Sequence, residues 1–279
     1  MQFVRCADLE LKTRGINHRV GSFRYKELGE GEPGTPGNYN LRLVWSETDF
    51  FSPRHMHNFD QVRVQLQGTF HFDADGAMKP GVAAYFPEGT PYGPQTSQQD
   101  TLQLVMQIGG PGGAGYLSEA QRVASVAALA ALGEFRDGKY FAPGKEGTGG
   151  TDGFQAAWEH AQARKMVYPP MRLQKPLFTN PESFAWTAVP GRPGAACKQL
   201  WRFGAHTVGL DMIRLDAGAT VDIAGPASCF VEQGAGTVHS GDTDESYTAH
   251  DTVHATRGET TTWTAAGTSM LIVFVHPDF

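Results

Sequence analysis

The stretch HMHNFDQVRVQLQG, residues 55–68, joins two closely spaced histidines to a segment of alternating polarity. Side chains two positions apart on a strand point to the same face, so His55 and His57 can face one cavity. Polar and apolar residues alternate along the segment that follows, and the polar set is Gln61, Arg63 and Gln65. The pattern predicts a strand whose polar face lies beside a histidine pair.

Runs typical of short strands surround this stretch, separated by turns rich in Gly or Pro. Before residue 110 they are FRYKEL, NLRLVW, TFHFD, VAAYF and TLQLVMQI, and after Lys198 they are QLWRF, TVGLDMIRL, SCFVEQ, GTVHS, TTTWTA and MLIVFVHP. Between the two groups, Ser118 with Gln121 indicates a capped helix that ends at Gly133, and Asp152 indicates a second helix. The sequence therefore predicts a mostly all-β protein with a short helical segment between two β units.

The composition excludes several classes of protein. The 279 residues include 23 Lys and Arg against 29 Asp and Glu, which gives a net charge of −6. A nucleic-acid partner is therefore not expected, because binding a phosphate backbone requires a basic excess. The 34 Gly and 17 Pro fit short strands and frequent turns better than a helical bundle.

The cysteines and the apolar runs indicate in which cellular compartment the protein is expected. Cys6, Cys197 and Cys229 are odd in number and far apart, so neither a disulfide framework nor a thiolate zinc site is expected. Charges such as Arg5 and Asp8 interrupt the N-terminus, which does not read as a signal peptide. The longest apolar run is too short to span a bilayer. We therefore expect a cytoplasmic protein with no membrane partner.

Two spaced motifs in the first half resemble those of the cupin superfamily. The first motif keeps its spacing through His55, His57 and Gly68 but has Gln61 at the position of a glutamate. The second runs from Gly81 through Pro87 and Gly89 and ends on Tyr92 where the third histidine belongs. The chain as a whole resembles a bicupin, which implies two double-stranded β-helix (jelly-roll) barrels. The corresponding domains would be residues 1–115, a helical linker over 116–170, and 171–279.

The resemblance implies one divalent metal ion, commonly Fe, Mn, Ni or Zn. Its ligands here would be His55, His57, Gln61 and Tyr92, or the two histidines completed by water. Replacing a carboxylate by the amide of Gln61 removes a negative charge and weakens such a site. Packing alternatives remain open for each ligand, since Gln61 can be a buried amide and Tyr92 a rim aromatic. His71 is a further candidate imidazole.

Arg63 and Tyr92 are the candidate catalytic residues. An arginine that faces a barrel interior needs an anionic or polar partner, which makes Arg63 a candidate for binding a substrate carboxylate. Tyr92 could then exchange a proton with an enolisable substrate, as in an isomerase or lyase, and dioxygenase chemistry is the other reading. Gln65 and Gln103 extend the predicted substrate-binding lining. A salt bridge to Asp60 or Glu88 is the alternative for Arg63.

The second half lacks these residues. Aligning Gly234 with Gly68 places Val221, Ile223 and Ala227 at the ligand positions, and aligning Gly236 instead places Ile223, Gly225 and Cys229 there. We therefore expect a degenerate C-terminal barrel.

Two functions follow from these features. The first is a metal-dependent bicupin enzyme acting on a small carbonyl, carboxylate or phenolic substrate. The alternative is a non-catalytic small-molecule-binding or structural protein that has lost its metal. The resemblance further implies a homodimer, with the first ~40 residues as an arm.

Overall fold

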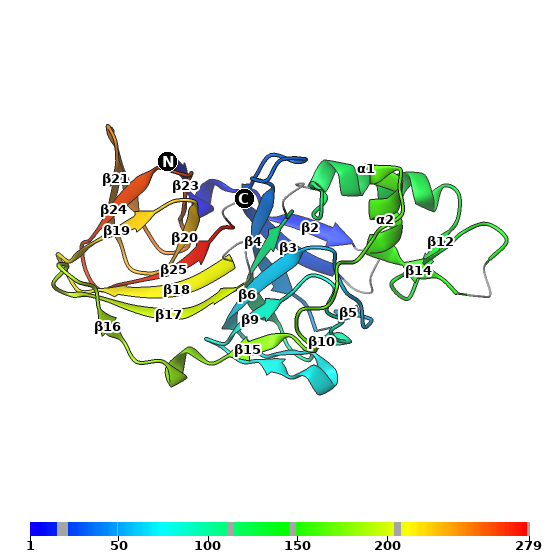
Figure 1. Ribbon diagram of the computed structural model, residues 1–279, viewed down its shortest axis with the longest axis horizontal. Coiled ribbons are helices and arrows are strands. Elements are labelled where there is room, and N and C mark those ends of the chain that lie inside the picture. Colours follow the sequence, from blue (N-terminus) through cyan, green and yellow to red (C-terminus); the bar gives the residue numbers. More distant parts are fainter. Residues whose placement is uncertain (16–21, 49, 111–113, 146–148, 204–207, 278–279) are drawn as a thin grey trace. The chain divides into compact units, whose positions relative to one another are not determined.

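The computed structural model describes residues 1–277 apart from 16–21, 49, 111–113, 146–148 and 204–207 (Figure 1). Strands make up 47% and helices 12%, which confirms the mostly β prediction. The chain divides into two compact units, of which unit 1 holds Met1–Glu10 and Asn180–Phe279 and unit 2 holds Leu11–Thr179. Each unit has a sheet of seven strands and a sheet of four.

The seven-stranded sheet of unit 2 carries the alternating segment at its centre. Its spatial order is β15 (Leu177–Thr179), β9 (Ala83–Phe86), β6 (Asp60–Gln67), β11 (Thr101–Ile108), β4 (Tyr39–Ser46), β3 (Ser22–Glu30) and β2 (Lys12–Gly15). All of these pairs are antiparallel, with Arg63 of β6 opposite Val105 of β11. The predicted strands FRYKEL, NLRLVW, QVRVQLQ, VAAYF and TLQLVMQI are confirmed.

Residues of both polarities are buried along β6, because both of its faces are covered. Gln61, Val62, Val64 and Gln65 are each at most 3% exposed. Gly68 ends the strand at φ +69°, where a Cβ would lie 2.5 Å from the carbonyl oxygen of Asp100. Only glycine fits that turn, since it combines a left-handed backbone with close approach of another chain segment.

The second sheet of unit 2 has four short strands. They are β5 (Phe51–Ser52), β10 (Gln95–Ser97), β7 (Phe70–His71) and β8 (Ala77–Met78). The predicted strand TFHFD is only partly formed, because Asp73 adopts a left-handed conformation (φ +51°) and starts the 3-10 turn η2 (Asp73–Asp75).

Two helices and a three-stranded sheet complete unit 2. The helix α1 (Glu119–Ala130) begins with the predicted capping box, in which the Ser118 hydroxyl accepts from the Gln121 N–H at 3.2 Å. The helix α2 (Gly153–Gln162) begins at Asp152, whose carboxylate accepts from the N–H of Phe154 at 2.9 Å. The small sheet consists of β12 (Glu134–Arg136), β13 (Lys139–Phe141) and β14 (Thr151–Asp152).

Unit 1 has an apolar core between its sheets. The larger is ordered β1 (Gln2–Val4), β23 (Thr252–Ala255), β20 (Ala227–Gln233), β25 (Ser269–Val275), β18 (Val208–Leu215), β17 (Ala195–Phe203) and β16 (Thr187–Ala188). The smaller is ordered β19 (Thr220–Ala224), β24 (Thr260–Ala265), β21 (Gly236–Ser240) and β22 (Thr243–Tyr247). Trp263 and Tyr247 are at most 1% exposed in this core. Two further 3-10 turns are η1 (Cys6–Asp8) and η3 (Pro181–Ser183).

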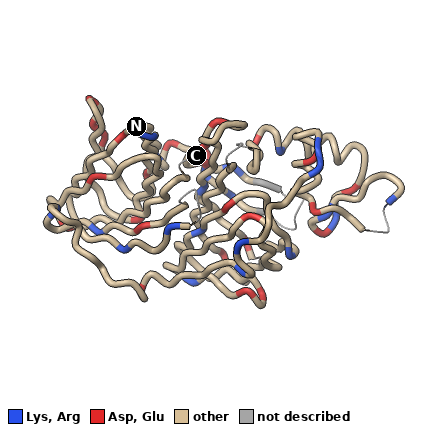
Figure 2. The backbone as a smooth tube through the Cα atoms, viewed as in Figure 1, with Lys and Arg blue, Asp and Glu red and all other residues tan. Residues whose placement is uncertain are grey.

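The bounds of the units differ from the predicted divisions at residues 115 and 170. The segment over 116–179 packs within unit 2, where β15 pairs with β9. The first residues belong to unit 1 because β1 pairs with β23, so the predicted N-terminal arm pairs with strands of its own chain. Figure 2 shows Lys and Arg interspersed with Asp and Glu along the chain. No helix in the described ranges is long and apolar enough to cross a membrane.

Candidate functional site

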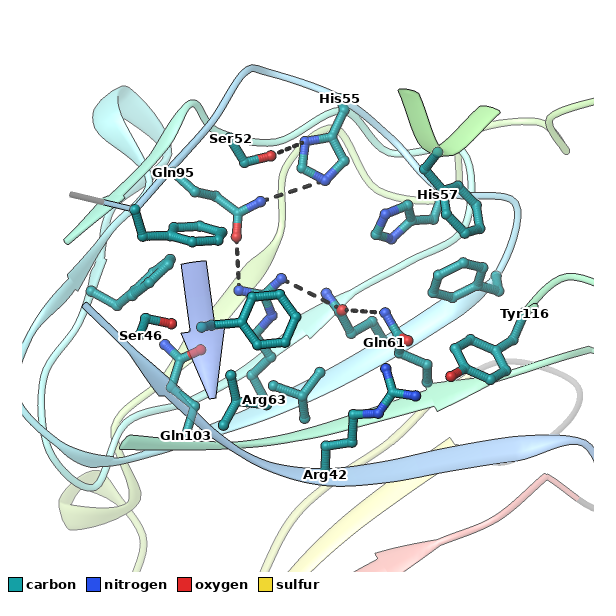
Figure 3. A pocket seen from close by; sticks show the side chains of 18 of the residues that line it. Arg42, Ser46, Ser52, His55, His57, Gln61, Arg63, Gln95, Gln103 and Tyr116 are labelled. Atoms are coloured by element: carbon teal, nitrogen blue, oxygen red, sulfur yellow. Dashed lines mark hydrogen bonds between the residues drawn. The ribbon is translucent and has the colours of Figure 1, made fainter. Parts of the chain in front are cut away.

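A cavity of about 150 Å³ lies within unit 2, beside the histidine pair. Its walls come from β3, β4, β6 and β11 of the larger sheet, from β5, β7 and β10 of the smaller sheet, and from α1 and α2. Figure 3 shows polar side chains converging from several of these strands. No aspartate or glutamate is among the described residues that line it.

The backbone brings the two motifs together. The N–H of His55 donates to the carbonyl of Tyr92 at 3.1 Å, and the N–H of Tyr92 donates to the carbonyl of His55 at 2.9 Å. The N–H of Gly89 donates to the carbonyl of His57 at 2.8 Å. The two imidazole rings lie 5.0 Å apart between centroids, and both line the cavity. The predicted orientation of the pair toward one cavity is therefore confirmed.

The surroundings of His55 set its tautomer. Its Nδ1 lies 2.7 Å from the carbonyl oxygen of Pro53, which can only accept a hydrogen bond. Nδ1 therefore carries the proton, and Nε2 keeps its lone pair. The amide nitrogen of Gln95 lies 3.4 Å from that Nε2 (Figure 3). His55 is thus a neutral imidazole whose basic nitrogen faces Gln95.

Gln61 links Arg63 to Tyr92. With its amide oxygen toward Arg63, that oxygen accepts from Nε and Nη2 of Arg63 at 3.1 Å each and from the Tyr92 hydroxyl at 3.3 Å. In the reverse orientation, which Figure 3 draws, Nη2 of Arg63 lies 3.5 Å from the amide oxygen of Gln61. A guanidinium can only donate, so the first orientation satisfies more groups. It also requires Gln107 to present its own amide oxygen to Gln61.

This orientation fixes the tautomer of His57 through Tyr92. The Tyr92 hydroxyl donates to Gln61, so its oxygen is left to accept from Nδ1 of His57, which lies 3.3 Å away. In the neutral tautomer that this contact selects, the lone pair of His57 lies on Nε2, as it does in His55. The His57 ring stacks on Phe59 with centroids 4.3 Å apart, which holds its plane. In their neutral forms, both imidazoles therefore carry the lone pair on Nε2.

Arg63 is a buried cation without a carboxylate partner. It is 9% exposed, and Nη1 donates to the amide oxygen of Gln95 at 2.8 Å. None of the ion pairs among the described residues includes Arg63, and the alternative partners Asp60 and Glu88 instead pair with Arg172 at 2.7 and 3.6 Å. Burial lowers the pKa of the guanidinium from its ordinary value.

Three aromatic rings partly stabilise this charge. The guanidinium carbon lies 5.1 Å from the centroid of Phe86, 5.5 Å from that of Phe72 and 6.0 Å from that of Phe70. Cation–π contacts of this kind contribute to holding an arginine in place, but they leave its net charge uncompensated. Arg63 therefore brings one positive charge to the cavity wall.

Two further arginines line the cavity and are paired. Nε of Arg42 lies 2.9 Å from a carboxylate oxygen of Glu27, and Nη2 of Arg122 lies 2.6 Å from one of Glu119. Burial opposes the charge of Arg42, but Tyr116 and Glu27 outweigh it and raise the pKa of its guanidinium. Burial and the neighbouring Arg42 lower the pKa of Arg122 to about 10.

The other predicted residues fall into two groups. Gln61, Arg63 and Gln103 line the cavity, whereas Gln65, Tyr92 and His71 are not among the described residues that do. Gln65 is fully buried and accepts from the amide of Gln103 at 2.6 Å, so it supports the lining from behind. Tyr92 packs in an apolar cluster with Phe72 and Phe86, with its hydroxyl toward His57 and Gln61.

Several residues that line the cavity were not predicted from the sequence. Arg42 could have been found from the alternation of NLRLVW, which places it on the face opposite Leu41 and Leu43. Gln95 follows the turn Gly93-Pro94, and nothing in its local pattern marks it. Phe154 lies in the first turn of α2, and it lines the cavity as a result of packing between elements that are distant in the sequence.

These residues do not fit a resident divalent metal ion. The two imidazoles are neutral nitrogen donors, whereas the amide oxygen of Gln61 already accepts from three donors and the Tyr92 hydroxyl is held between two groups. No cluster of three or more His, Cys, Asp or Glu side chains occurs in the described part of the chain. A divalent cation would also face the charge of Arg63 without an anionic ligand to offset it.

Solved structures share the fold of this chain. A "putative dioxygenase" from Nostoc punctiforme PCC 73102 superposes with a TM-score of 0.63 at 12% identity, over 99% of this chain and 82% of that one. Oxalate decarboxylase from Bacillus subtilis at pH 4.6 gives 0.57 at 12% identity, over 97% and 75%. The chain has a bicupin fold.

A third similar structure is the "putative glyoxylate induced protein" from Pseudomonas aeruginosa, with a TM-score of 0.59 at 12% identity over 91% of this chain and 79% of that one. No family model matches the sequence. A search of curated proteins also finds no match. At 12% identity, these structural similarities establish the fold and say nothing about the activity.

In the C-terminal half, the positions that align with the candidate ligands lie in an apolar core. Val221, Ile223, Ala227 and Cys229, which align with ligand positions of the first half, are each at most 7% exposed in the apolar core of unit 1. Apolar packing has replaced polar lining there. The histidine pair and the buried Arg63 occur together in the cavity of unit 2, and no counterpart was identified at the aligned positions described in unit 1.

Proposed function

We propose that the cavity of unit 2 is the active site of a bicupin enzyme that binds a small organic carboxylate on Arg63. The observation that carries this proposal is the buried guanidinium at the cavity wall, which has two glutamine amides and the Tyr92 hydroxyl as partners but no carboxylate. A buried charge without an ion-pair partner is costly, and an anionic ligand removes that cost. Among proteins of this fold, oxalate decarboxylase is named for a small carboxylate substrate.

The two imidazoles support proton-transfer chemistry. A carboxylate bound at Arg63 lies next to Gln95, which in turn contacts Nε2 of His55. That nitrogen is unprotonated and can take a proton from the carbon beside the carboxylate or beside an adjacent carbonyl. The negative charge left on the substrate stays close to Arg63. Returning the proton to a neighbouring carbon completes an isomerisation, and loss of a leaving group instead completes an elimination.

This chemistry belongs to the isomerase or lyase class. Oxygenase chemistry, the other reading of the sequence, calls for a metal at the histidine pair, and the donor set described above does not favour one. Tyr92 is better placed as a positioning residue than as the proton donor, because its hydroxyl holds His57 and Gln61 from behind the cavity. His55 takes over the role of base in this proposal.

Binding and proton exchange test the proposal together. Calorimetric titration with acetate, pyruvate and benzoate should show saturable binding that is lost in Arg63→Met. Deuterium exchange into the methyl group of pyruvate, followed by NMR, should be accelerated by the wild type and not by His55→Gln. His239→Gln is the matched control, since His239 is an exposed histidine of unit 1 paired with Asp244. Carboxylate binding that survives unchanged in Arg63→Met would contradict the proposal.

A further inference from the structure

The charge of the cavity wall limits the charge of its ligand. Arg42 and Arg122 face Glu27 and Glu119, so these two cations and two anions cancel. Arg63 is left as one uncompensated charge, and no carboxylate among the described residues lines the cavity. A ligand with a single carboxylate balances this wall, whereas a second carboxylate would have no cation to meet.

The remaining wall is rich in aromatic rings. Six rings line it, and they belong to Phe23, Phe50, Phe59, Phe70, Tyr116 and Phe154. They come from both sheets of unit 2, from the residues just before β5 and β6, from α2 and from the chain before α1, so they face the cavity from several sides. Placing a second charge against such a surface costs free energy because the rings cannot replace its hydration. An apolar body gains free energy there instead.

The size of the cavity sets the size of that body. Its volume is about 150 Å³. An apolar cavity of about 150 Å³ holds one benzene ring. This pocket is partly open rather than enclosed, so a single six-membered ring fits the volume and its carboxylate can lie toward the guanidinium at the wall.

We infer that the cavity selects a monocarboxylate carried on an apolar body of about one aromatic ring, and that it discriminates against small dicarboxylates such as oxalate. The inference rests on the proposed function, since it uses Arg63 as the anion site. This ligand class differs from oxalate, the substrate for which oxalate decarboxylase is named.

Calorimetric titration of the full chain with benzoate, acetate, oxalate and benzyl alcohol tests this inference. Benzoate should bind at least about tenfold more tightly than acetate or oxalate, because burying a ring-sized apolar group is worth about tenfold or more in affinity. Benzyl alcohol has the ring without the charge and should also bind at least about tenfold more weakly. In Arg63→Met, the preference for benzoate over benzyl alcohol should be lost.

A ring variant tests the apolar wall separately. Phe154→Leu should weaken benzoate binding severalfold and weaken acetate binding much less. Phe230→Leu is its matched control, because Phe230 is a fully buried ring of unit 1 that does not line the cavity. Circular dichroism establishes that both variants are folded before they are titrated.

The outcomes separate the two proposals. If acetate and oxalate bind through Arg63 as tightly as benzoate does, the ligand class is wrong and the carboxylate site stands. If none of the three carboxylates binds the wild type, or if all bind Arg63→Met equally well, the proposed function itself fails. Tighter binding of benzoate that depends on both Arg63 and Phe154 supports both.

Discussion

Replacing Arg63 by methionine should change the free energy of unfolding of the ligand-free protein by no more than about 1 kcal/mol. The same substitution should abolish carboxylate binding. Burial of an unpaired guanidinium carries a penalty of several kcal/mol, which the substitution removes. Against this, the amide oxygen of Gln95 loses its donor, at about 1–3 kcal/mol if it is left unsatisfied, and that of Gln61 keeps only the Tyr92 hydroxyl. Methionine fills similar space with a flexible apolar chain, so the two effects nearly cancel.

Arg42 is the matched comparison. It is as buried as Arg63 but pairs with Glu27 and Glu119, so Arg42→Met leaves both carboxylates with one donor fewer. Breaking a fully buried ion pair costs about 3–5 kcal/mol, and the carboxylates here are 20% and 26% exposed, so we expect a cost near the lower end. The difference between the two variants should therefore be at least about 2 kcal/mol, although both remove one arginine from the same cavity.

Urea unfolding without ligand measures this difference. The midpoint and slope are followed by circular dichroism, and hydrogen exchange of peptides from β6 and β11 assigns the change to unit 2. Titration with benzoate then checks that Arg63→Met has lost its ligand. Equal destabilisation by the two variants would refute the reasoning, since it would mean that Arg63 has a compensating partner in the free protein.

Four further predictions concern single features. Tyr92→Phe removes the hydroxyl between Gln61 and His57 and should lower the free energy of unfolding by about 1–3 kcal/mol in urea, an unchanged value being the contrary result. Protein purified without an affinity tag should hold well under one metal ion per chain by mass spectrometry, equally in the wild type and in His55→Ala/His57→Ala. One ion per chain that the double variant loses would show that the donor set does bind a metal. Burial, and then the neighbouring His254, lowers the pKa of His276 to about 3. The unfolded chain therefore binds a proton below about pH 6.5 that the folded chain rejects, and stability should fall from pH 6.5 toward pH 3 by at most about 1.4 kcal/mol per unit. The slope should be smaller in His276→Gln, and an identical slope would exclude His276 as its source. The homodimer that the resemblance implies should give twice the monomer mass in light scattering, and the monomer mass would contradict it.

The sequence predicted the strands of this chain and the histidine pair better than it predicted the chemistry around them. Alternation identified β6 and its polar face because polarity of period two is a local signal. The motif spacing correctly predicted that Tyr92 lies beside His55, because the backbones of the two segments pair there. Spacing does not decide where a phenol points, and Tyr92 turns into an apolar cluster with only its hydroxyl at the site. Gln95 and Phe154 enter through packing between distant segments, which no local pattern encodes.

Gln61 shows how one neutral residue changes what such a site can bind. At the position where the first cupin motif has a glutamate, its amide oxygen accepts from Nε and Nη2 of Arg63 at 3.1 Å without neutralising the guanidinium. A carboxylate at the same place would form an ion pair with Arg63 and would also offer an anionic ligand beside the two imidazoles. The amide does neither, so the positive charge remains available to a ligand and the imidazoles remain neutral bases. The same substitution that weakens a cation site therefore creates an anion site, because the charge that it removes is the one that would have compensated Arg63.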